Sequence, residues 1–133
     1  MAPDFPLDSV AAVRECCAAL PHSRETFPFG PDTLVFKVGS APGGKLYALI
    51  GIQAEELSVS LKVRPERGDE LRVSYPAITP GYHLNKRHWV TVKLEGVPGD
   101  LVQSLLAESH ALVYASLTRA QRLELEVLGA TKR

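Results

Sequence analysis

The sequence predicts a two-layer α+β domain in which one antiparallel sheet is covered by helices on one face. Three observations support this class. Apolar residues recur at helical spacing near both ends of the chain, and period-two alternation fills most of the middle. A short stretch over residues 65–76 interrupts the alternating part with helix-start and helix-stop signals. The resulting order, α-β(3)-α-β(2)-α(α), is typical of a sheet whose apolar face packs against helices.

Length and composition are those of one globular domain. The 133 residues fit a single core, and a composition of 45% apolar and 23% charged residues argues against extended disorder. No internal repeat or interdomain linker divides the chain, so one domain is expected over residues 1–133. Because 15 basic groups balance 15 acidic groups, the sequence gives no reason to expect strong nonspecific attraction to nucleic acid.

A helix is expected first, near the beginning of the chain. Asp8 or Ser9 can cap it, and Pro21 follows to end it. Cys16 and Cys17 are adjacent and lack the CxxC spacing of a redox site, so two free thiols are expected. The apolar stripe of this helix consists of Leu7, Val10, Ala11, Val13, Cys17 and Leu20.

The same region bears on localisation. The first twenty residues of the chain carry charges and lack the uninterrupted apolar segment of a signal peptide. No apolar run in the sequence approaches membrane-spanning length. Free thiols are usual in a reducing compartment. These observations predict a cytoplasmic protein with no membrane partner.

Three strands are expected next, each with one buried face. The inward positions are Leu34, Phe36 and Val38; Leu46, Ala48, Ile50 and Ile52; and Leu57, Val59, Leu61 and Val63. Between the first two lies GSAPGGKL, which matches the first seven positions of a phosphate-binding loop. Leu46 replaces the hydroxyl that such a loop needs, and a strand pattern follows where a helix is required. A glycine-rich hairpin is therefore the expected structure.

The second half of the chain returns to helices after two more strands. PERGDELRVSYP opens with proline and acidic residues and predicts a short helix, and ITPGYHLNKRH reads as a short strand and a turn. A last strand follows, in which Val90, Val92 and Leu94 alternate with polar residues and Trp89. An amphipathic stripe from Pro98 to about Leu117 predicts a long helix, and a shorter helix can follow from Thr118.

The outward positions of the strands are polar, cationic and aromatic. One interpretation is an ordinary solvated face, because antiparallel sheets commonly expose one side. The other is a binding surface on which lysines contact phosphates and an aromatic ring offers a stacking plane. The residues expected on this face are Lys37, Tyr47, Ser58, Ser60, Lys62, Trp89, Thr91 and Lys93.

The stretch TPGYHLNKRHWVTV concentrates hydrogen-bonding and cationic side chains in one turn. Pro80-Gly81 is a turn signal, and the turn is expected to present Tyr82, His83, Asn85, Lys86, Arg87 and His88. From Thr79 to Lys93 the local charge is +3, from two lysines and one arginine with no acid. Such a turn can hold phosphates or an acidic protein segment. The alternative is a structural hairpin whose charges keep a sheet edge soluble while Trp89 fills the edge of the core.

No catalytic or metal site is recognisable. His83 and His88 are five residues apart across the turn, but no carboxylate lies nearby in sequence to complete a metal site. The sequence lacks a GxSxG frame, and its paired acids lie at positions typical of solvated surfaces. We therefore expect a noncatalytic protein with no cofactor and no metal.

Five segments together resemble the MmcQ/YjbR family of small bacterial proteins. They are PFGPDTLVFKV from Pro28, GKLYALIGI from Gly44, SVSLKV from Ser58, YPAITPGYHLNKRHWVTV from Tyr75 and SHALVYASL from Ser109. The segment from Tyr75 is the most specific, because the family carries a histidine-tryptophan pair after a lysine-rich turn. In the last segment, His110 follows Ser109 at a position where the family is expected to have an aromatic residue. The resemblance implies a two-layer fold similar to secretion chaperones, and DNA binding through a double-wing motif.

Two functions follow as hypotheses. In the first, the protein binds nucleic acid. Lys86 and Arg87 contact phosphates, and further lysines on the sheet extend this line of phosphate contacts: Lys37, Lys62 and Lys93. Asn85, His83 or His88 contact base edges, and Trp89 stacks on an unpaired base. In the second, an exposed strand or the sheet face captures a peptide, a protein partner or a second copy of the chain. The sequence leaves the oligomeric state open.

Overall fold

A computed structural model describes residues 9–27, 33–39, 44–51, 57–81 and 85–131, and only the backbone over 128–131. The elements in chain order are α1 (Val10–Ala18), β1 (Ser23–Thr26), β2 (Thr33–Val38), β3 (Lys45–Gly51), β4 (Ser58–Lys62), α2 (Pro65–Ser74), β5 (Ile78–Pro80), β6 (Trp89–Lys93), a 3-10 turn η1 (Leu94–Gly96), α3 (Gly99–Ala115) and α4 (Arg119–Thr131). The predicted α+β class and the order of the helices are confirmed.

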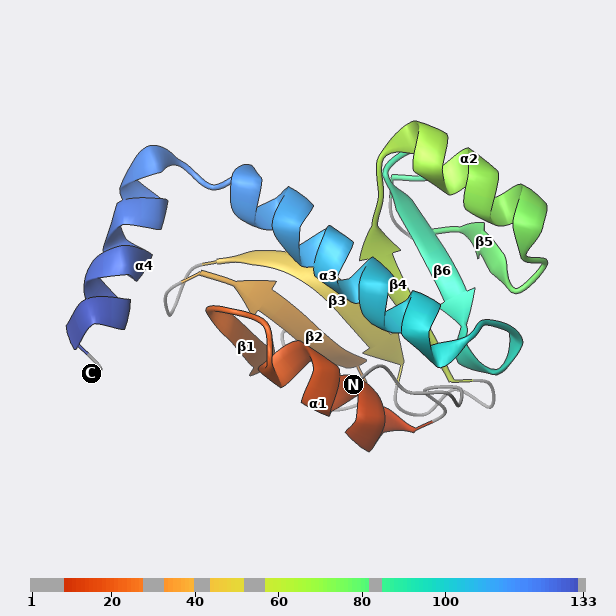
Figure 1. Cartoon of the computed structure of the whole chain (residues 1–133), viewed down its shortest axis with the longest axis horizontal. Helices are drawn as coiled ribbons and strands as arrows, with labels where there is room; N and C mark the ends of the chain where they lie inside the picture. Colours follow the sequence, from red (N-terminus) through yellow and green to blue (C-terminus); the bar gives the residue numbers. More distant parts are fainter. Residues whose placement is uncertain (1–8, 28–32, 40–43, 52–56, 82–84, 132–133) are drawn as a thin grey trace.

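The strands form one antiparallel sheet with the order β1-β2-β3-β4-β6-β5. Figure 1 shows α3 running across the sheet, with α1 and α2 on the same side of it. The fourth helix, α4, leads away from the end of α3 and beyond the sheet. The expectation that helices cover one face is therefore confirmed for α1, α2 and α3.

The core lies between α3 and the inward residues of the strands. Cross-strand partners share a face, and two rows of partners cross the sheet. Their members are Phe36, Ala48, Leu61 and Val90 in one row and Leu34, Ile50, Val59 and Val92 in the other. All are buried, and Val102, Leu105, Leu106 and Val113 of α3 pack on them. The alternation read from the sequence therefore identifies the inward face of most strands.

Local signals in the sequence define several element ends. Ser9 caps α1 by accepting a hydrogen bond from the Ala12 amide, and Pro65 occupies the first turn of α2. The predicted hairpin joins β2 to β3. Its described ends are Gly39 and Gly44, whose φ angles of 133° and 105° lie in a region that L side chains rarely adopt. The glycine-rich stretch therefore connects two strands, and β3 begins at Lys45 where a phosphate-binding loop needs a helix.

Strand β1 was not predicted, so the sheet has six strands instead of five. Its sequence, Ser23 to Thr26, contains no apolar residue and so has no period-two signal. The strand is held by specific polar contacts instead: Glu25 pairs with Arg14 of α1, and the Thr26 hydroxyl donates to the Val35 carbonyl. As an edge strand, β1 needs only one neighbour in the sheet.

The expectation that Tyr47 lies on the outward face is wrong. The register shifts between Phe36 and Lys37, so Phe36 pairs with Ala48 while Lys37 pairs with Leu46, and Tyr47 is the extra residue between them. Tyr47 is fully buried on the helix side, and its hydroxyl meets the Ser23 hydroxyl. Burial raises the pKa of Tyr47, which keeps the phenol neutral.

A hydroxyl from α3 enters the sheet beside this bulge. Ser109 accepts a hydrogen bond from the Lys62 amide at 2.8 Å and donates one to the Tyr47 carbonyl at 2.6 Å. The side chain is fully buried. Ser109 therefore bridges β3 and β4 and fixes α3 to the sheet at the position where the two strands separate.

His110 joins α3 to the connection between α1 and β1. Its Nε2 lies 2.6 Å from the Pro21 carbonyl oxygen, which can only accept, so Nε2 carries a proton. The ring meets Tyr47 edge-on at 5.2 Å and stacks with Tyr114 at 6.3 Å. His110 stands where an aromatic residue was expected, and its planar ring still lies between Tyr47 and Tyr114.

Candidate nucleic-acid interface

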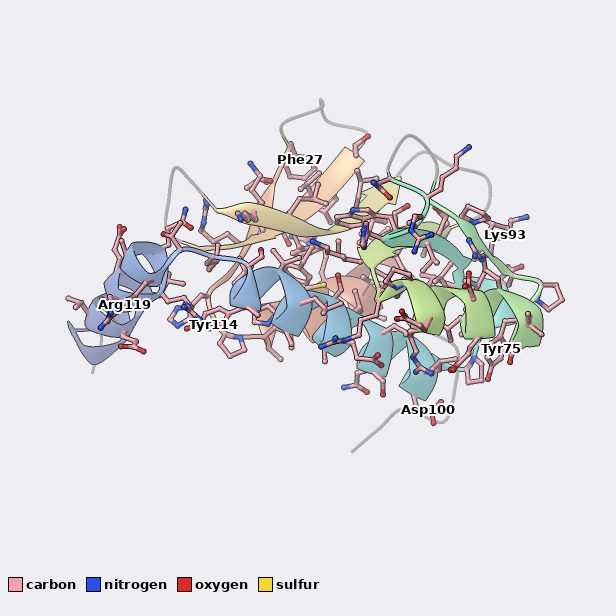
Figure 2. The ribbon with its side chains drawn as sticks, turned by 90° about the horizontal axis from the view of Figure 1, so that it is seen from above. Phe27, Tyr75, Lys93, Asp100, Tyr114 and Arg119 are labelled. Carbon is pink, nitrogen blue, oxygen red and sulfur yellow. The ribbon has the colours of Figure 1, made fainter. Side chains whose placement is uncertain are left out.

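The face of the sheet opposite the helices carries most of the side chains predicted for it. In the pairing of β4 with β6, Lys62 lies opposite Trp89, Ser60 opposite Thr91, and Ser58 opposite Lys93. These pairs alternate with the buried apolar pairs, so they face away from the helices. We call this side the open face. Figure 2 separates the layers, with Lys93 on the strand side and Asp100 and Tyr114 on the helix side.

The described strand residues of the open face carry four cationic side chains and no acidic one. Lys37, Lys62 and Lys93 were predicted there, and Arg24 of β1 joins them because it pairs with Lys37. Arg24 was missed because β1 itself was missed. The one acid of these strands, Glu25, lies on the helix side, where it pairs with Arg14. The two faces of the sheet therefore differ in charge.

The cationic side chains are spread over the face. Lys37 on β2 and Lys62 on β4 are separated by one strand, which corresponds to about 10 Å. Lys62 and Lys93 lie at opposite ends of the β4–β6 pair, on the order of 13 Å apart along the strands. Spacings of this size suit contacts with several phosphates of one strand better than a single small anion.

The centre of the open face is less polar than the sequence predicts. Ser60 and Thr91 share a hydrogen bond of 2.9 Å between their hydroxyls. Ser60 is buried, and Val35 on the same face is fully buried. Leu49 and Leu46 are half-buried there, so the prediction that Leu46 points inward is wrong; the register shift at Tyr47 turns it outward. The prediction of a polar outward face is therefore correct for β4 and β6 and wrong for the middle of β2 and β3.

The turn before β6 presents its side chains to solvent. Asn85 organises it: its side-chain oxygen accepts from the Arg87 amide at 2.9 Å, and its carbonyl accepts from the amides of His88 and Trp89. Asn85, Lys86, Arg87 and His88 are all exposed. Tyr82 and His83, also predicted in this turn, lie outside the described residues.

Trp89 connects the turn to the open face. It is half-buried and pairs with Lys62. Behind it, the Gly81 amide donates to the Trp89 carbonyl at 2.9 Å, and a Cβ on Gly81 would lie only 2.7 Å from the Trp89 Cβ. Gly81 therefore allows β5 to approach the tryptophan closely. The geometry brings together Lys62, Trp89 and the exposed turn, while Lys37 and Lys93 extend the same face.

The described residues offer little for catalysis. Within them, no group of three or more histidine, cysteine or acidic side chains is placed to hold a metal ion. Burial raises the pKa of Cys17 to about 12, so this thiol is not a ready nucleophile. No helix in the described part of the chain is both long and apolar enough to cross a membrane.

Fold and surface together define a class: a small α+β domain with one helix-covered face, an opposite sheet face whose described strand residues carry four cations, and an exposed turn beside it. The chain belongs to the YjbR family, whose model matches residues 18–112. The resemblance drawn from the five segments is thereby confirmed.

Bacterial relatives agree with this assignment. The chain is 36% identical over 103 residues to the uncharacterised protein YjbR of Escherichia coli strain K12, covering 77% of this chain and 84% of that one. It is 35% identical over 101 residues to the uncharacterised YbdF of Escherichia coli O157:H7, covering 75% and 80%. The crystal structure of Deinococcus radiodurans DR2400, a DUF419 domain, superposes with a TM-score of 0.86 at 51% identity, covering 93% and 92%.

Proposed function

We propose that this protein binds nucleic acid without catalysis, through the open face and the turn over residues 85–88. The observation that carries the proposal is the separation of charge on the sheet: the described strand residues of the open face hold four cations and no acid, although the whole chain has no net charge. A local cationic surface on a neutral protein attracts a polyanion in one orientation.

The turn and the face have different roles in this proposal. Lys86 and Arg87 are exposed at the entrance to β6 and contact phosphates there, and Lys62, Lys37 and Arg24 continue the track across the sheet. Trp89 lies between them and stacks on a base, while Asn85 and His88, exposed in the turn just before it, contact base edges. Phosphate contacts give affinity, and the stacking and edge contacts give any preference among bases.

The test uses Trp89 as a probe, because it is the only tryptophan of the chain. Single- and double-stranded DNA and RNA are titrated at about 50 and 200 mM salt while tryptophan fluorescence and the anisotropy of labelled nucleic acid are followed. A saturable change that weakens steeply with salt is the expected result. Reversing Lys86 and Arg87 to glutamate should abolish it.

The matched control reverses Arg119 and Arg122, which lie on α4 away from the open face, and is titrated with a short oligonucleotide that a single face can hold. It changes the net charge by the same amount as the first double variant and should leave binding within about twofold. Equal losses in both variants would mean that only the total charge matters, and full affinity after reversal of Lys86 and Arg87 would overturn the proposal.

Capture of an extended peptide at the edge of the sheet is the second candidate. The edge strand β1 ends beside Phe27, whose side chain is 50% exposed on the strand side (Figure 2). An added strand would pair with β1, and the phenyl ring would cover one of its apolar residues. Such binding depends weakly on salt, so it is distinguished from the first candidate by the same titration with a peptide in place of DNA.

A further inference from the structure

The last helix, α4, presents an apolar ridge to solvent. Leu123 and Val127 lie four residues apart and share one side of the helix, with exposed fractions of 49% and 64%. Leu125 points the other way and is 2% exposed. Glu124 and Glu126 lie on either side of the ridge, each about 80° around the helix from its centre. The ridge is therefore an apolar line flanked by carboxylates.

The corner between α3 and α4 fixes the direction of this ridge. Leu117 is buried at the corner. Thr118 and Gln121 cap α4 reciprocally, with 2.8 Å from the Thr118 amide to the Gln121 side chain and 3.1 Å from the Gln121 amide to the Thr118 hydroxyl. Figure 1 shows α4 leading away from α2. For these reasons the ridge is not directed at the helices of its own chain.

A groove of about 320 Å³ lies between α2 and α3. Its apolar lining comes from Ala111, Leu112 and Ala115 near the end of α3, and Arg64 and Arg67 from the start of α2 border it. Glu108 also lines the groove and pairs with Arg67 at 3.4 Å. The groove is thus an apolar channel with a cationic border on the α2 side.

We propose that α4 of one chain docks in the α2–α3 groove of a second copy. The fit has two parts. The leucine and valine of the ridge cover the alanines and leucine of the groove, and the glutamates beside the ridge meet the arginines at the border. The groove and α4 lie at the same end of the molecule, because the groove lining ends at Ala115 and α4 begins at Arg119.

A two-fold symmetric pair uses this contact twice. Each α4 enters the groove of its partner, so the buried area of one contact is doubled, which helps a small surface reach the roughly 1,200 Å² of a stable interface. The helix lies beyond residues 18–112, the part that matches the YjbR family model. The proposed dimer does not rest on nucleic-acid binding, because it uses the helix layer and α4.

The experiment measures the molar mass of the full chain against concentration by sedimentation equilibrium. A reversible dimer is expected. Changing Leu123 and Val127 to serine should weaken it by roughly tenfold or more, because two apolar side chains are lost from each contact. The matched control is Val73→Ser, which alters an 87% exposed apolar residue near the end of α2 and should leave the dimer unchanged.

A charge exchange identifies the two surfaces directly. One variant carries Arg64→Glu and Arg67→Glu, and a second carries Glu124→Arg and Glu126→Arg. Each alone should be monomeric, because like charges then meet in both contacts. An equimolar mixture should form a heterodimer, since both of its contacts pair opposite charges.

The mixture also controls for folding, because two unfolded variants could not form a dimer when mixed. A wild-type chain that stays monomeric to about 1 mM, or a mixture that stays monomeric, overturns the proposal.

Discussion

Ser109 shows how one residue can determine where a helix meets a sheet. Its hydroxyl satisfies both the Lys62 amide and the Tyr47 carbonyl, two backbone groups that face each other across the separated strands. A buried backbone group without a partner costs free energy comparable to a lost hydrogen bond. The serine therefore compensates for the bulge that places Tyr47 in the core.

Ser109→Ala should lower the free energy of unfolding by about 1–3 kcal/mol, because two buried backbone groups would lose their partner. The measurement is urea unfolding followed by tryptophan fluorescence and circular dichroism. Ser104→Ala is the matched control, since Ser104 lies on the same helix and is exposed; its effect should stay within about 0.5 kcal/mol. Equal stability of Ser109→Ala and the wild type would show that the bridge contributes nothing.

At the scale of elements, the β5–β6 pair links the fold to the candidate interface. Gly81 directly follows β5 and lies behind Trp89, and its amide donates to the Trp89 carbonyl. The three atoms nearest to a Cβ built on Gly81 all belong to Trp89, at 2.7 to 3.1 Å. A side chain at this position would have to displace the backbone of β6 at the point where the exposed turn enters the sheet.

Gly81→Ala is therefore expected to destabilise the protein by about 1–3 kcal/mol and to change the emission of Trp89. It should also weaken nucleic-acid binding, because the tryptophan and the turn would move together. Thr79→Ala serves as the control, since Thr79 is exposed on the same short strand. A Gly81→Ala protein with unchanged emission and stability would contradict the close approach described here.

The elements that the sequence predicts are those with a periodic apolar signal. Helices α1, α2, α3 and α4 and strands β2 to β6 each carry such a signal or a clear start or stop residue. Strand β1 has neither, because its polar side chains are used in particular pairings such as Arg14 with Glu25, and these depend on a helix distant in sequence. Pairings of this kind become visible only after the chain has folded.

The candidate site was predictable to a similar extent. The turn from Asn85 to His88 follows from local turn chemistry, and the structure exposes all four of its side chains. Lys62 and Trp89 follow from alternation, and they are cross-strand partners. Arg24 and the inward position of Tyr47 were not predictable, because one depends on an unsignalled strand and the other on a one-residue shift in register.

For the whole molecule, the two proposed surfaces occupy different sides. The open face lies across the strands, whereas the groove lies between α2 and α3 on the helix layer. A dimer formed through α4 would therefore leave both open faces accessible. Two linked faces would bind one long nucleic acid more tightly than either alone, because the second contact forms at a high effective concentration.

The stability of the whole fold should depend on pH through His110. This side chain connects α3 with the α1–β1 connection, and its surroundings include His22, Tyr47 and Tyr114. Burial lowers the pKa of His110 below its usual 6.5; the hydrogen bond to the Pro21 carbonyl opposes this shift, and the nearby His22 adds to it. The folded protein therefore holds the neutral ring more strongly than the unfolded chain does.

The sign of the effect follows from proton binding. As pH falls through 6.5, the unfolded chain takes up a proton at His110 before the folded protein does, so the free energy of unfolding decreases until the pH is below the lowered pKa. Each unit of difference between the two pKa values corresponds to about 1.4 kcal/mol. Urea unfolding at several pH values between about 7.5 and 5 measures this loss.

His110→Gln should remove this pH-dependent loss of stability, so that the wild type and the variant approach each other in stability at low pH. His88→Gln, which removes a histidine at an exposed turn position, is the comparison variant. A constant difference between wild type and His110→Gln across this range would mean that the buried ring does not couple folding to protonation.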